Sequence, residues 1–351
     1  MTPQQVWTRT LTSVRPFVTI LFFIIVVLLL SLEASAWRNF NWSLFVANAK
    51  YVSLSRALIA VAFIHLGFLL RAVRWNILLH PVRAAQFERL IGPTIIGFAG
   101  LALLGRPGEI VRPYLISRKF GLSMSSQLAT LTIERIFDSG CAGILILIAI
   151  LASSKAGTLP YEGDLRGGSL LFLALMAALA FIAFLMAKTG KKLGHLLGRA
   201  LSPLPKGLAE YVTRVLGSFS SNLNAIRDAR SAVKITILSI AIWLFVGVAY
   251  LETIHAFGGL RVMSFGDAVL LMGCALLGSF VQLPGGGTHQ LITVAALIQV
   301  FGVPTELAVS CGILGWLTIY MAPVPLGMFM LRYEQLSLRA LLQIRTRQSM
   351  A

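Results

Sequence analysis

Eight ionisable side chains lie between residues 106 and 138, in a part of the chain that is otherwise apolar. They are Arg106, Glu109, Arg112, Arg118, Lys119, Glu134, Arg135 and Asp138. Arginine presents planar, paired N–H donors that match phosphate oxygens. Five of the eight are basic and three acidic, so three ion pairs would leave two cations. This surplus favours binding of a phosphate-bearing group, and Arg112, midway between Arg106 and Arg118, is the expected direct contact.

Glu134 and Asp138 are four residues apart, so they share one face of a helix. The segment around them is apolar enough to lie in a membrane, where ionisable residues are costly and usually paired. We expect one of these two carboxylates to pair with an arginine near residue 106. A purely structural ion-pair clasp is an open alternative, and so is catalysis with Glu109 or Asp138 as a base.

A second unusual stretch reads LPGGGTHQ, residues 283–290. A run of glycines can hold an anion with its backbone amides, but this one lacks the Gly-Lys-Ser/Thr ending of a nucleotide-binding loop. The sequence leaves open whether His289 lines a site, relays protons or sits in the core. The full set of expected substrate-binding residues is Arg106, Glu109, Arg112, Arg118, Glu134, Arg135, Asp138, Gly285, Gly286, Gly287, His289 and Gln290, with no catalytic residue, metal ligand or cofactor.

The elements that must position these residues are membrane helices. The chain has 351 residues, of which 57% are hydrophobic and 12% charged, against about 25% charged in soluble domains. An all-α polytopic membrane protein follows. Aromatic residues in several segments suit anchoring at the membrane interface: Trp75, Trp243, Trp316, Tyr250 and Tyr320. The expected spans are 17–32, 58–79, 125–151, 169–187, 235–256 and 306–331.

Two further apolar segments, 90–118 and 268–302, are interrupted by Gly and Pro. Basic residues concentrate in 71–89, 188–234 and 332–351, and cytoplasmic loops are the ones enriched in Lys and Arg. Placing these loops inside requires about six crossings with both termini in the cytoplasm. Each interrupted segment then has to enter and leave on one side, as a re-entrant hairpin, and the two hairpins enter from opposite sides.

The chain is expected to form a single membrane domain, 1–351, containing two similar parts. Residues 90–153 and 268–331 each carry a Gly/Pro break, a Phe-Gly pair and a following long helix, which predicts an inverted repeat. Between them, 188–234 combines nine basic residues with leucines at helical spacing. These are expected to be cytoplasmic amphipathic helices, lying either on lipid headgroups or on the bundle itself.

The stretches GRPGEIVRPYLISRKFG with IERIFD, and LPGGGTHQ with FGVPTELA, resemble the transmembrane, flippase-like region of bacterial lysylphosphatidylglycerol synthases. The resemblance implies lipid translocation across the inner membrane, without the aminoacyl-transferase domain of the full synthases. The chain departs from the family at Gln290, where the family usually has glutamate, so a proton-coupled role for that position does not carry over.

We therefore expect translocation of an anionic phospholipid or glycolipid in the bacterial inner (cytoplasmic) membrane. The alternatives are a membrane enzyme acting on a lipid or polyprenyl phosphate, and a non-transporting scaffold for a lipid- or glycan-modifying enzyme. The net charge of +17 is explained by cytoplasmic loops and not by nucleic acid binding. The lipid, the energy source and the oligomeric state stay open.

Overall fold

The computed structural model describes residues 40–80, 86–152, 229–278 and 284–334, with the single positions 167, 170 and 174. The described residues form helices, and no strand occurs among them. Three of these helices are long and apolar enough to cross a membrane: Leu54–Leu79, Arg230–His255 and Thr305–Tyr333. The prediction of an all-α polytopic membrane protein is confirmed.

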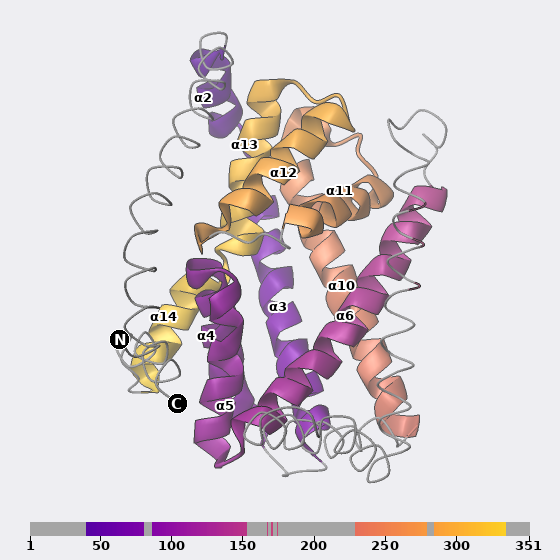
Figure 1. The fold of residues 1–351 in the computed structure, drawn as a ribbon. Helices are drawn as coiled ribbons and strands as arrows, with labels where there is room; N and C mark the ends of the chain where they lie inside the picture. The colour runs from indigo at the N-terminus through magenta and orange to yellow at the C-terminus, as the bar shows by residue number, and fades with distance from the viewer. Residues whose placement is uncertain are drawn as a thin grey trace, which may run out of the picture.

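Helices α3 (Leu54–Leu79) and α10 (Ala229–His255) form an antiparallel pair at the centre of the described bundle (Figure 1). The backbone N–H of Ser53, just before α3, donates to the carbonyl of Ala256, just after α10, at 2.9 Å. Ala60 of α3 and Ala249 of α10 are fully buried in one cluster. Small residues of this kind let two membrane helices approach closely.

The first interrupted segment forms a helical hairpin of α4 (Glu88–Leu104), η1 (Arg106–Ile110) and α5 (Val111–Phe120). Gly105 ends α4 with φ 69° and ψ −150°, a conformation that glycine adopts far more readily than other residues. A Cβ on Gly97 would lie 2.4 Å from Cβ of Arg112, so that glycine lets the second arm approach the first. Phe120, at the end of α5, packs in the same cluster as Leu90. The chain thus returns to the end from which it entered.

The second interrupted segment follows the same route through α11 (Phe265–Gly278), η3 (Pro284–Gly286) and α12 (Gly287–Gln299). Gly285 and Gly286 have φ of 77° and 74°. A Cβ on Gly278 would lie 2.8 Å from the carbonyl oxygen of Thr288, so these arms also pack closely. Since α4 follows the end of α3 and α11 follows the end of the antiparallel α10, the two hairpins begin at opposite ends of the bundle.

A long helix follows each hairpin after a left-handed glycine: Gly121 (φ 63°) precedes α6 (Met124–Ala152), and Gly302 (φ 66°) precedes α13 (Thr305–Gly315). The second of these helices is broken. It continues through a π-helical turn, η4 (Trp316–Tyr320), into α14 (Pro323–Tyr333). Such π-helical segments are rare in proteins, and many of those that occur lie at functional sites.

The two hairpin tips meet at η4. The indole N–H of Trp316 donates to the carbonyl of Gly285 at 2.6 Å, and the Tyr320 hydroxyl donates to the carbonyl of Leu101, near the first tip, at 3.5 Å. Gly286 lies against the ring of Tyr320, since a Cβ there would be 2.3 Å from it. The break in the last long helix therefore contacts both hairpins.

One short helix lies outside this arrangement. Helix α2 (Trp42–Lys50) is capped by the side chain of Asn41, which accepts from the N–H of Leu44 at 3.1 Å. The backbone N–H of Asn41 donates to Glu306, at the start of α13, at 3.1 Å. This bond joins α2 to the second half of the chain.

Some predictions fall elsewhere. Two of the expected spans lie outside the described residues: 17–32, and 169–187 apart from two positions. The same holds for residues 188–228 of the basic segment. Its last residues, 229–234, form the start of α10. The prediction of interfacial anchoring is wrong for Trp75, Trp243 and Tyr250, which are buried with 0%, 8% and 5% of their surface exposed. They pack in the interior because they contact the buried polar groups described next.

Candidate functional site

Five buried ionisable residues form what we call the arginine–carboxylate cluster: Arg71 and Arg74 of α3, Arg112 of α5, and Glu134 and Asp138 of α6. Arg71 and Arg74 are three apart and Glu134 and Asp138 four apart, so each pair projects from one helix face. The hairpin brings Arg112 against the same carboxylates. Three helices are thus joined by charge in the interior.

Arg74 lies at the centre of the cluster and is completely buried. Its guanidinium donates to Glu134 Oε1 at 2.5 Å, to Asp138 Oδ1 at 2.7 Å and to the Ser239 hydroxyl of α10 at 2.7 Å. Charge-assisted hydrogen bonds of this kind are among the strongest in proteins. Arg74 therefore holds α3, α6 and α10 together.

Arg112 pairs with both oxygens of Glu134, one of them at 3.2 Å. Its guanidinium carbon stands 4.0 Å from the ring centre of Trp75, a cation–π contact that partly replaces lost hydration. The prediction that Glu134 or Asp138 pairs with an arginine of the first hairpin is confirmed.

Arg71 donates to Asp138 Oδ2 at 2.8 Å and lies 3.8 Å from Glu134. It is flanked by the rings of Phe98, at 5.1 Å, and Trp243, at 5.9 Å. The cluster contains three arginines and two carboxylates, and therefore carries one formal positive charge in excess. Burying an unpaired charge costs free energy. Binding of an anion would neutralise the excess charge and is therefore favoured here.

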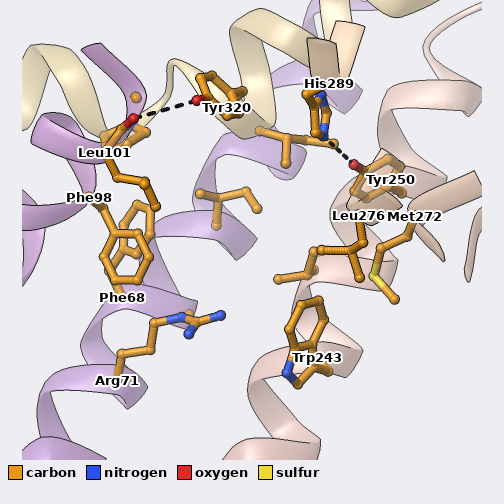
Figure 2. A pocket seen from close by; sticks show the side chains of 16 residues that line it. Phe68, Arg71, Phe98, Leu101, Trp243, Tyr250, Met272, Leu276, His289 and Tyr320 are labelled. Carbon is orange, nitrogen blue, oxygen red and sulfur yellow. Dashed lines mark hydrogen bonds between the residues drawn. The ribbon is translucent and has the colours of Figure 1, made fainter. Parts of the chain in front are cut away.

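Arg71 also faces a cavity of about 170 Å³. Figure 2 shows Arg71 and Trp243 toward one end of the cavity, and Tyr250, His289 and Tyr320 toward the other. The lining comes from α3, α4, α10, α11, α12, η4 and α14, so both hairpins contribute to it. Of the described residues that line it, Arg71 is the only charged one, and most of the others are apolar.

At the far end of the cavity, the Tyr250 hydroxyl and His289 Nε2 are 2.8 Å apart in a buried hydrogen bond. The His289 ring also lies 5.4 Å from the ring of Tyr320. The cavity thus has a cationic end and an uncharged polar end, separated by apolar side chains. An amphipathic molecule with a small anionic group fits this chemistry.

The remaining predicted residues are spread over several places. Arg106 pairs with Glu109 at 3.0 Å on the surface, and Arg118 is near Tyr114, with its Nη1 3.3 Å from the hydroxyl. Arg135 lies beside Arg112 and Glu109 in a small second pocket. Gly285 and Gly286 contact η4, Gly287 begins α12, and Gln290 is half-buried outside the cavity lining.

Arg71 and Arg74 are not among the residues expected from the sequence, because their charges fit the positive loop segment 71–89 equally well. A signal was present, since both lie inside the span predicted to end at residue 79. Ionisable residues within a span mark functional or paired sites. Their spacing of three also places them on one helix face.

Comparison with known proteins agrees with this picture of a membrane protein. The chain is 25% identical over 280 residues to a UPF0104 membrane protein of Methanothermobacter thermautotrophicus, covering 77% of this chain and 81% of the relative. No solved structure matches the chain. A family model described as the lysylphosphatidylglycerol synthase TM region matches residues 17–327. Because this match spans most of the sequence, the chain belongs to the lysylphosphatidylglycerol synthase TM region family.

Proposed function

We propose that this protein moves a lipid with an anionic, phosphate-bearing headgroup between the two faces of a membrane. The observation that carries the proposal is the position of Arg71. It belongs to a buried cluster with one excess positive charge and faces an apolar cavity between the two halves of the chain. A phosphate in the cavity would neutralise the excess.

The arrangement of the hairpins supports the same function. Helix pairs that are broken by glycine, and that begin at opposite ends of an antiparallel bundle, resemble the inverted repeats of membrane transporters, which bind substrate near the middle of the bilayer. We infer that the two hairpins are re-entrant and form an inverted repeat. Movement of one half against the other would then open the cavity to alternate sides.

Within this proposal Arg71, and not Arg112, makes the direct contact with the phosphate. Arg112 is bound to Glu134 and does not line the cavity. Arg106 and Arg118 lie on the surface of the first hairpin. Glu134 and Asp138 would hold Arg71 and Arg74 in place. The membrane is expected to be the inner membrane of a bacterium, with both termini on the cytoplasmic side.

A catalytic role for the cluster is less well supported. Both carboxylate oxygens of Asp138 accept hydrogen bonds from arginines, which leaves this residue poorly suited to remove a proton. Glu109 is paired with Arg106 away from the cavity. We therefore propose transport and not turnover of the lipid.

The test is reconstitution of the purified protein in liposomes with a fluorescent phosphatidylglycerol in both leaflets. We expect a membrane-impermeant reductant to bleach more than the outer-leaflet fraction when the protein is present, with no change in the mass of the lipid. An altered lipid mass would favour the enzyme. Bleaching equal to that of protein-free liposomes, with the lipid unaltered, would favour the scaffold. Cysteine labelling at Lys192 and Arg339 tests the orientation, and labelling from outside the cell would contradict it.

A further inference from the structure

Two buried polar atoms among the residues that line the cavity have no hydrogen-bond partner in the part of the chain that the structure describes. They are the indole N–H of Trp243 and Nδ1 of His289. The two residues are 8% and 6% exposed. An unpaired buried polar group is costly, and the large majority of such groups in proteins have a partner. A bound molecule would supply partners to both.

Trp243 lies toward the same end of the cavity as Arg71 (Figure 2), and its ring centre is 5.9 Å from the Arg71 guanidinium carbon. The indole N–H can only donate, so its natural partner is an acceptor. Together the indole and the guanidinium offer a phosphate both charge and directed donors.

His289 lies at the uncharged end, and its other ring nitrogen is bonded to Tyr250. Nδ1 is therefore either a donor or an acceptor, depending on which way the Tyr250 hydrogen bond runs. A hydroxyl group can satisfy either form, because it both donates and accepts. An ammonium group would only donate, and no carboxylate is present among the described lining residues to offset its charge beside Arg71.

The cavity has room for such a headgroup. Its volume of about 170 Å³ far exceeds the roughly 10–15 Å³ that one water molecule needs. We propose that the cavity binds an anionic phospholipid whose headgroup also carries a neutral hydroxyl. Arg71 and Trp243 hold the phosphate and His289 binds the hydroxyl. This inference rests on the proposed function and names the class of lipid.

The experiment compares two short-chain lipids of equal charge, dihexanoyl phosphatidylglycerol and dihexanoyl phosphatidylpropanol, which lacks the headgroup hydroxyls. Their Kd values are measured by titration calorimetry on the full-length protein in detergent. We expect the wild type to bind the glycerol lipid about tenfold more tightly, the value of one buried hydrogen bond.

Two variants separate the roles. His289→Phe should weaken binding of the glycerol lipid alone and so remove the preference, and His289→Gln should restore part of it. Trp243→Phe keeps an aromatic ring but loses the N–H donor. It should therefore raise the Kd values of both lipids by a similar factor and leave the preference for the glycerol lipid intact. Thr293→Val, one turn further along α12 and outside the cavity lining, should leave both Kd values unchanged.

Equal affinity of the wild type for the two lipids would overturn this inference, since water alone would then satisfy His289, and this comparison needs no variant to fold. Equal weakening of both lipids in His289→Phe would also overturn it. Binding of neither lipid would contradict the anionic site itself. Selective binding without movement in liposomes would leave the inference standing and contradict the proposed transport.

Discussion

In the first hairpin the chain turns back at Gly105, and in the second at Gly285 and Gly286. Both hairpins then end at a Phe-Gly pair whose glycine is left-handed, and both lead into a long helix. Their side chains differ. The first carries Arg112 into a buried charged cluster, whereas the described residues of the second hairpin tip and of α12 are uncharged.

The comparison shows that the turn of the backbone and the placement of charge are independent of each other. A helix can be broken inside the bundle by glycines in left-handed or similar conformations, without any charged residue. The charge is added on one side only, where α3 and α6 can supply partners for it. The cavity between the hairpins is consequently asymmetric, with Arg71 toward one end and the Tyr250–His289 pair toward the other (Figure 2).

The largest expected effect comes from breaking the charged side. Asp138→Ala leaves three arginines against one carboxylate in the interior, and removal of one partner from a buried ion pair costs about 3–5 kcal/mol. We expect a sharp fall in folded yield, measured by size-exclusion chromatography in detergent. Glu252→Gln breaks a partly exposed pair with Arg56 and serves as the control. Normal yield of the Asp138 variant would show that the cluster is not buried.

The second hairpin should be sensitive to shape instead of charge. Gly285→Ala introduces a side chain at φ 77° but meets no atom within 4 Å, so it should cost about 1–2 kcal/mol. Gly286→Ala, at φ 74°, also drives a Cβ into the Tyr320 ring, which adds about 1–3 kcal/mol of overpacking. In thermal unfolding, the Tm of Gly286→Ala should therefore be well below that of Gly285→Ala. The reverse order would contradict the contact between this tip and η4.

Arg112→Lys tests whether the first hairpin is held by geometry as well as by charge. Lysine keeps the charge but loses the two-pronged contact with Glu134 and the stacking on Trp75. We expect a stability loss of about 1.5–3 kcal/mol, the value of one charge-assisted hydrogen bond, with transport largely retained. Arg112→Gln should lose more stability. If Arg112→Lys lost transport at full stability, Arg112 and not Arg71 would be the phosphate ligand.

The smallest effect is expected at the exposed start of the first hairpin. Arg106 and Glu109 are three positions apart on η1, and the Arg106 side chain is 44% exposed. Exposed ion pairs contribute about 0–1 kcal/mol, so Arg106→Gln should change neither stability nor transport markedly. A loss of transport comparable to that of a cluster variant would restore Arg106 to the substrate site.

The sequence predicted the course of the backbone better than the side chains that meet at the cavity. Segment 90–118 carries its breaks in Gly105, Pro107 and Gly108, and the second segment carries Pro284 to Gly287, so local chemistry located both hairpins. The pairing of Glu134 with Arg112 was also predictable, because intramembrane charges seek partners.

Arg71 carried the same signal, a charge inside a predicted span, but its place beside the cavity and the roles of Trp243 and Tyr250 were not predictable by these means. They are brought to the cavity by the antiparallel packing of α3 and α10, whose residues there are more than 160 positions apart, as the Arg74–Ser239 bond shows. Trp and Tyr are the residue types enriched at membrane interfaces, so their type alone indicates an exposed position for Trp243 and Tyr250. Their burial results from the packing of the helices around them.

Transport by Arg71→Gln tests most directly whether Arg71 binds the lipid headgroup. This substitution removes one partner of Asp138, but it leaves two arginines against two carboxylates and Asp138 keeps its bond to Arg74. Folded protein should therefore still be obtained, checked by size-exclusion chromatography, while the phosphate loses its cation. In liposomes the wild type should move phosphatidylglycerol faster than phosphatidylcholine. Arg71→Gln should reduce movement of phosphatidylglycerol by about tenfold or more. Equal rates for the two lipids in the wild type, or full activity of a folded Arg71→Gln, would contradict the claim that Arg71 binds an anionic headgroup.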